Sequence, residues 1–136
     1  MLKKLVVLGG FFLLTSGCSS TVPIKAPESI VGKWQITQVE KQKLSLLGQS
    51  TITFKQDNKV SGFNACNNFF GQYQQQDNQL SFSPMGTTMK ACVDSLMQQE
   101  RKTMQAITQV TYVKGDSQKL QLLNEDHKVL LILNRL

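Results

Sequence analysis

The sequence predicts an α+β fold: an antiparallel sheet of about eight strands that curls, barrel-like, around one helix. Three observations support this fold class. Apolar and polar residues alternate in a series of short segments, turn-forming residues separate those segments, and a helical period of apolar residues occurs once. The 136 residues favour a single domain, and a hydrophobic fraction of 40% is enough to form a core.

Alternation in the first half of the domain predicts strands joined by tight turns. In the first strand, Trp34, Ile36 and Val39 are apolar among polar neighbours. Asp and Asn in the segments 56–58 and 76–78 favour turns, so each segment joins its two flanking strands into a hairpin. The strands expected here are 31–39, 51–54, 59–63, 70–73 and 80–82.

One helix is expected over residues 95–108, after Pro84 and Gly86 have ended the strand pattern. Ser95 and Gln98 have the spacing of a capping box at the helix N-terminus. The helix then presents one apolar stripe to the sheet. The residues of that stripe are Leu96, Met97, Met104, Ile107 and Val110.

Three further strands are expected after the helix, over residues 110–113, 120–123 and 129–133. Gly, Asp and Ser at 115–117 and the acidic pair at 125–126 supply the turns between them. The last strand is apolar without alternation, which predicts that both of its faces are covered.

The N-terminus has the pattern of a bacterial lipoprotein signal. Lys3 and Lys4 precede an apolar run that is too short to span a bilayer, and Cys18 follows small residues. The segment resembles a lipobox, so we expect cleavage of a signal peptide over 1–17 and lipidation of Cys18; an ordinary signal peptide with a chance cysteine is the alternative. Residues 18–29 contain Ser and Pro and form a flexible tether. By resemblance to enterobacterial sorting rules, Ser19 rather than Asp after the cysteine implies the outer membrane, facing the periplasm.

Charge and composition exclude several function classes. Of 15 basic residues, Lys3 and Lys4 leave with the signal peptide, so 13 face 9 acidic residues in the rest of the chain. The basic residues do not interleave with aromatic residues, so we expect no nucleic-acid partner. With one His and scattered carboxylates, we expect no enzyme activity, no metal site and no cofactor.

A two-part motif carries the strongest family signal. The first part is Cys66-Asn67-Asn68-Phe69-Phe70-Gly71-Gln72-Tyr73, and the second is Thr88-Met89-Lys90-Ala91-Cys92. The chain here resembles the META-domain family, the envelope group that includes the heat-shock protein HslJ. The resemblance extends over the domain 30–136, and Ala65 stands where family members often carry Gly. The motif residues are Asn67, Phe70, Gly71, Tyr73, Thr88 and Met89.

The motif is expected to be mainly structural. Asn and Gly residues favour bulges and positive φ, so the first part turns a corner of the sheet, although polar groups beside aromatic rings also suit a small polar or lipid ligand. Outside the cytoplasm, Cys66 and Cys92 are expected to form a disulfide, and two buried free thiols are the alternative. A soft-metal site that adds Met89 and His127 to these cysteines is a weaker hypothesis.

Two functions from different classes remain. The first is a non-enzymatic, lipid-anchored META-domain protein of the cell envelope, which acts as a tethered interaction module. The resemblance implies a link to stress tolerance, including heat and the antibiotic novobiocin. The second is a binding protein for an apolar or lipid ligand, similar to a secretion pilot lipoprotein. The expected partners are the membrane, through Cys18, and an envelope protein or apolar ligand.

Overall fold

Strands account for much of the chain that the structure, a computed structural model, describes: residues 25–44 and 49–136. The predicted signal peptide, Cys18 and the beginning of the predicted tether lie outside these residues. In chain order the elements are β1 (Gly32–Val39), β2 (Gln42–Lys43), β3 (Ser50–Phe54), β4 (Lys59–Asn64), β5 (Asn68–Gln76), β6 (Gln79–Phe82), β7 (Gly86–Thr87), α1 (Asp94–Thr108), β8 (Tyr112–Gly115), β9 (Lys119–Leu123) and β10 (Val129–Arg135).

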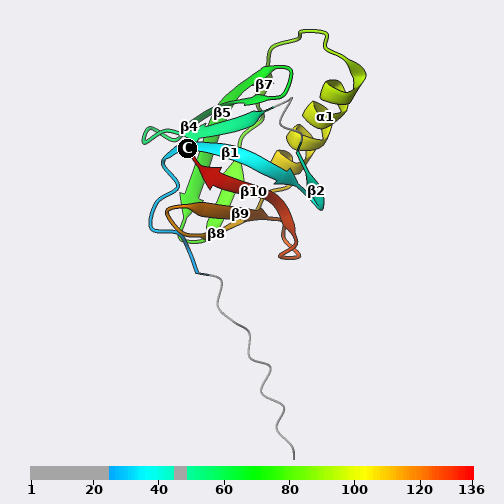
Figure 1. The fold of residues 1–136 in the computed structure, drawn as a ribbon. Coiled ribbons are helices and arrows are strands. Elements are labelled where there is room, and N and C mark those ends of the chain that lie inside the picture. Colours follow the sequence, from blue (N-terminus) through cyan, green and yellow to red (C-terminus); the bar gives the residue numbers. More distant parts are fainter. Residues whose placement is uncertain (1–24, 45–48) are drawn as a thin grey trace, which may run out of the picture.

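The antiparallel sheet closes into a barrel (Figure 1). Its strand order is β1-β3-β4-β5-β6-β8-β9-β10, and β10 pairs with β1 to complete the ring. The short strands β2 and β7 lie outside this ring, where β2 pairs with β1 and β7 with β5. The predicted fold class, a barrel-like antiparallel sheet with one helix, is therefore confirmed.

Side chains fill the inside of the barrel. Trp34, Phe54 and Phe69 are each at most 1% exposed, and leucines of β9 and β10 pack beside them. A ring of eight strands encloses a space just wide enough for such side chains. The chain enters this core before β1, because Pro27 and Ile30 are buried and the Trp34 Nε1 donates to the Ile30 carbonyl at 2.8 Å.

Helix α1 covers one end of the barrel (Figure 1). It contacts β1, β4, β6 and β10, which lie at different points around the ring, and it buries Thr103, Ala106 and Ile107. We call this the helix end; it also holds the β4–β5 and β9–β10 turns. The β3–β4 and β8–β9 turns and the last residues of β10 lie at the opposite end, which we call the tether end.

The start of the helix differs from its predicted form. The N-cap is Val93, with extended backbone and no side-chain hydrogen bond, so Ser95 lies inside the first turn and the predicted capping box is wrong. The carbonyl of Val93 accepts hydrogen bonds from Leu96 and Met97. Of the predicted stripe, Ile107 and Val110 are fully buried, whereas Met97 and Met104 are partly exposed.

Local irregularities explain the other differences from the predicted strands. A register shift between Ile36 and Gln38 allows Val39 to point inward together with Ile36. A second shift in β10 buries both Leu130 and Leu131. Ile132 is nevertheless partly exposed, so the expectation that both faces of the last strand are covered is wrong at this position.

Candidate functional site

The turn between β4 and β5 builds one side of the site. The Asn64 side-chain oxygen accepts the Asn67 N–H at 3.0 Å, and the Asn64 N–H donates to the Asn67 carbonyl at 3.0 Å. Between them Ala65 has φ of 82°, a left-handed conformation that glycine adopts without strain. A glycine at this position would remove the strain. The Asn64 Nδ2 is buried without a hydrogen-bond partner in the described part of the chain.

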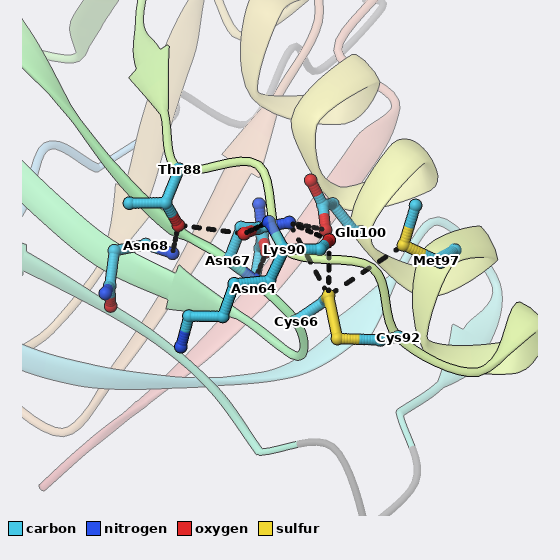
Figure 2. Close-up of a disulfide and its surroundings, with 9 residues drawn as sticks. All are labelled: Asn64, Cys66, Asn67, Asn68, Thr88, Lys90, Cys92, Met97 and Glu100. Carbon is cyan, nitrogen blue, oxygen red and sulfur yellow. Dashed lines mark hydrogen bonds between the residues drawn. A yellow bond between two sulfur atoms is a disulfide. The ribbon is translucent and has the colours of Figure 1, made fainter.

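A disulfide joins this turn to the N-terminus of α1 (Figure 2). Cys66 and Cys92 are 26 residues apart in sequence, and their sulfurs are bonded at 2.05 Å. The structure therefore decides between the two alternatives for these cysteines in favour of the disulfide. The Cys66 Sγ also lies 3.8 Å from the Met97 Sδ and 3.5 Å from the Lys90 carbonyl oxygen. Because a disulfide sulfur carries no hydrogen, these two approaches are packing contacts.

The side chain of Asn67 is the centre of the site, and it is only 2% exposed. Its Nδ2 donates to the Glu100 carboxylate at 2.9 Å and to the Lys90 carbonyl at 3.2 Å. Its Oδ1 accepts from the Lys90 N–H at 2.7 Å and from the Thr88 hydroxyl at 2.8 Å. Figure 2 shows how these bonds converge. One amide thus uses both donors and both acceptor positions to hold three segments together.

Thr88 fixes the segment that follows β7. Its hydroxyl accepts the Asn68 N–H at 3.0 Å, and its own N–H donates to the Asn68 carbonyl at 2.9 Å. These bonds continue the pairing of β7 with β5 beyond Thr87. We refer to the disulfide together with Asn67, Thr88 and Glu100 as the clamp.

The remaining motif residues lie outside the clamp. Tyr73 is buried, and its hydroxyl donates to the Lys55 carbonyl at 2.7 Å. Its ring contacts the Phe54 ring edge-on, with 5.1 Å between the ring centres. Burial raises the pKa of the Tyr73 hydroxyl. The side chain that a substitution would place at Gly71 would meet Met85 at 3.0 Å. The hydrogen bond and the close packing give Tyr73 and Gly71 structural roles.

Phe70 and Met89 point outward. The Phe70 ring is 56% exposed and lies over Gly86, where an added Cβ would come within 2.5 Å of the ring. Met89 is 95% exposed, although its neighbours Thr88 and Lys90 are both bonded to Asn67. Val93 next to the disulfide is 66% exposed. We call Phe70, Met89 and Val93 the motif surface.

Sequence reasoning missed Glu100. It lies three residues after Met97 and seven before Ile107, so it interrupts the apolar stripe of the helix. A carboxylate on an otherwise apolar stripe was the available signal for a buried polar partner. His127 lies on the β9–β10 turn, where it stacks on Tyr112 at 4.6 Å between ring centres. Within the described residues, no group of three or more His, Cys, Asp and Glu side chains could hold a metal ion.

The comparison with known families identifies the domain. The profile of the META domain matches residues 28–135. The chain belongs to the META-domain family. No curated protein sequence matches it.

Solved structures share the fold of this META domain. The NMR structure of a protein from Burkholderia xenovorans is 22% identical, with a TM-score of 0.63 over 77% of this chain and 81% of that one. The crystal structure of a DUF4847-family protein from Bacteroides vulgatus is 16% identical, with a TM-score of 0.57 over 77% of this chain and 92% of that one. At these identities the similarity is one of fold. None of the described helices is both long and apolar enough to cross a membrane.

Proposed function

We propose that this META-domain protein is a non-enzymatic interaction module of the bacterial cell envelope, attached by lipid on Cys18 and contributing to tolerance of heat and novobiocin. Its anchor faces the periplasm from the outer membrane. The N-terminal residues support the anchor because two lysines, a short apolar run and a cysteine after small residues form a lipobox-like pattern. The family membership supports the link to stress tolerance.

The motif surface is the observation that carries the interaction role. Only four large hydrophobic side chains of the described residues are exposed, and Phe70, Met89 and Val93 are three of them. Phe70 lies on β5, which pairs with β7, and Met89 and Val93 lie on the segment between β7 and α1. Exposed apolar side chains in this one part of the domain favour a contact with another molecule. The clamp holds the segments behind Met89 and Val93 rigidly, so this surface is preorganised for an apolar patch on another envelope protein.

The clamp itself favours a binding role over catalysis. Every donor and acceptor of the Asn67 amide is bonded within the protein. The oxidised sulfurs of Cys66 and Cys92 offer no thiolate as a nucleophile. The polar groups of the motif therefore position the surface beside them.

Carriage of an apolar ligand, the second hypothesis, has less support. The side chains of Trp34, Phe54, Phe69 and their neighbours fill the barrel where a lipid chain would have to enter. The outer groove along β5 and β6 is lined mainly by polar residues, including Asp57, Gln72 and Gln74. This groove suits a polar ligand on the surface of the domain rather than a lipid chain.

Photo-crosslinking in living cells tests the interaction role. A photoreactive amino acid replaces Met89 in one variant and the exposed Lys128, on the β9–β10 turn of the same end, in a control. We expect a discrete crosslinked protein from position 89, and none from position 128. Equal or absent crosslinking at both positions, with normal protein levels, would overturn the proposal.

The anchor is tested separately. Cys18→Ala should abolish incorporation of a labelled fatty acid and release the protein from the membrane fraction. Continued labelling of the Cys18→Ala variant would contradict lipidation at this residue. The Ser20→Ala variant provides the control, since it changes a residue of the same segment but leaves Cys18 and the disulfide in place.

A further inference from the structure

The tether end of the barrel carries a group of lysines at the point where the described chain begins. Lys25 is the first described residue, and it shares a shallow surface groove with Lys114, Asp116 and Lys119 of the β8–β9 hairpin. Figure 1 shows that the chain enters beside this hairpin, at a distance from α1. Three lysines from two separate parts of the sequence thus meet at one place.

These lysines leave a positive charge that the protein does not neutralise. Lys25, Lys114 and Lys119 are exposed or partly exposed, and none forms an ion pair within the described residues. Asp116 is the acidic residue among them. Its carboxylate accepts the Gln118 and Lys119 N–H groups at 2.8 and 2.9 Å, and these backbone bonds lower its pKa. It therefore stays ionised, and the group retains two net positive charges.

The excess of positive charge extends over the tether end. Four further basic residues lie there or along the adjoining strand ends: Lys33, Lys55, Lys59 and Arg135. The other acidic residues of that end are Glu28, Asp57 and Asp77, and Asp57 pairs with Lys59 at 2.9 Å. At the helix end, basic and acidic residues nearly balance. The domain is therefore electrically polarised along the barrel, and its positive end is the one that holds Lys25.

The length of the chain before the domain restricts what this end can face. Cys18 lies seven residues before Lys25. Seven residues span at most about 25 Å even when fully extended. A lipid on Cys18 would therefore keep the group of lysines within about 25 Å of the headgroups. From there the lysines can reach the layer of about one Debye length, roughly 10 Å, in which anionic lipid attracts them.

We propose that the tether end of the barrel binds an anionic phospholipid surface through Lys25, Lys114 and Lys119. This contact turns the helix end, with the motif surface of Phe70, Met89 and Val93, away from the membrane toward its partner. The inference rests on the proposed anchor for its position in the cell. The contact itself depends on the lysines and is measurable without the lipid.

Vesicle sedimentation tests this contact. The chain from residue 18 onward, with Cys18→Ser and the disulfide formed, is mixed with phosphatidylcholine vesicles that contain or lack phosphatidylglycerol. We expect binding only with phosphatidylglycerol, and weaker binding as salt is added. Lys114→Gln/Lys119→Gln should lower the partition coefficient about 30-fold, which corresponds to about 1 kcal/mol for each lysine near an anionic surface.

A matched variant removes the same charge from the helix end. Lys41→Gln/Lys128→Gln changes two exposed lysines there and should leave the partition coefficient within about twofold of the parent. Equal losses in both variants, or equal binding to both kinds of vesicle, would overturn the proposal. Absence of binding at low salt would overturn it as well. The Cys18→Ala labelling experiment remains independent, so failure of the anchor and failure of this contact are distinguishable.

Discussion

Replacement of Asn67 by alanine removes the centre of the clamp. The amide makes four hydrogen bonds of 2.7–3.2 Å with Thr88, Lys90 and Glu100. A typical hydrogen bond contributes about 1 kcal/mol, and the bond to the Glu100 carboxylate contributes more. Because the partly exposed Glu100 regains water, we expect a total loss of about 3 kcal/mol in the free energy of unfolding. This loss is large, because the total free energy of unfolding of a domain is only about 5–15 kcal/mol.

Urea denaturation of the oxidised protein measures this loss. Asn68→Ala is the matched control, because the Asn68 side chain is exposed and its bonds to Thr88 come from the backbone. We expect the control to change stability by less than about 0.5 kcal/mol. A double-mutant cycle with Thr88→Val should show a coupling of about 1 kcal/mol with Asn67→Ala. A loss below about 1 kcal/mol for Asn67→Ala, or no coupling, would refute the clamp.

Three further predictions concern the same region. Asn67→Asp places a second carboxylate beside Glu100, and repulsion between the two favours a protonated pair in the folded state. The variant should therefore recover stability relative to the parent as pH falls from about 7 to 4. A difference in stability that does not depend on pH would refute this prediction. Cys66→Ser and Cys92→Ser should each lower the free energy of unfolding, measured in urea, by about 3.5 kcal/mol. The double variant should lose no more than either single variant, because all three open the same loop, and additive losses would contradict this prediction. Ala65→Gly should change the free energy of unfolding by less than about 0.5 kcal/mol, because relief of the positive φ offsets the lost methyl group. Ala106→Gly in α1, where φ is not positive, should lower it by about 2 kcal/mol. Similar losses in the two variants would contradict backbone strain at Ala65.

Local sequence patterns predicted most of the fold. Alternation placed Trp34 and Ile36 inside, and the single helical segment was located to within one residue of its observed start. These predictions succeeded because side-chain period follows directly from backbone geometry. Val93 as N-cap was not predicted, since helix-capping preferences are weak compared with the disulfide that fixes Cys92 next to it.

The site could be predicted only in part. The expected location outside the cytoplasm predicted a disulfide between Cys66 and Cys92, and the structure joins them. The bond between Asn67 and Glu100 connects residues 33 apart in sequence, and no local period reveals such a contact. The outward direction of Phe70 was equally hidden, because Phe69 and Phe70 are adjacent and only the register of β5 decides which one enters the core.

The most direct test of the interaction role separates the motif surface from the clamp. In the double variant Met89→Ser/Val93→Ala, two exposed apolar side chains are removed or shortened while every bond of the clamp remains and the helix gains no new N-cap hydrogen bond. Its melting temperature and the survival of cells under heat and novobiocin are measured together. We expect an unchanged melting temperature and a loss of tolerance equal to that of a deletion strain. Full tolerance in cells that carry the stable variant would contradict the role of this surface.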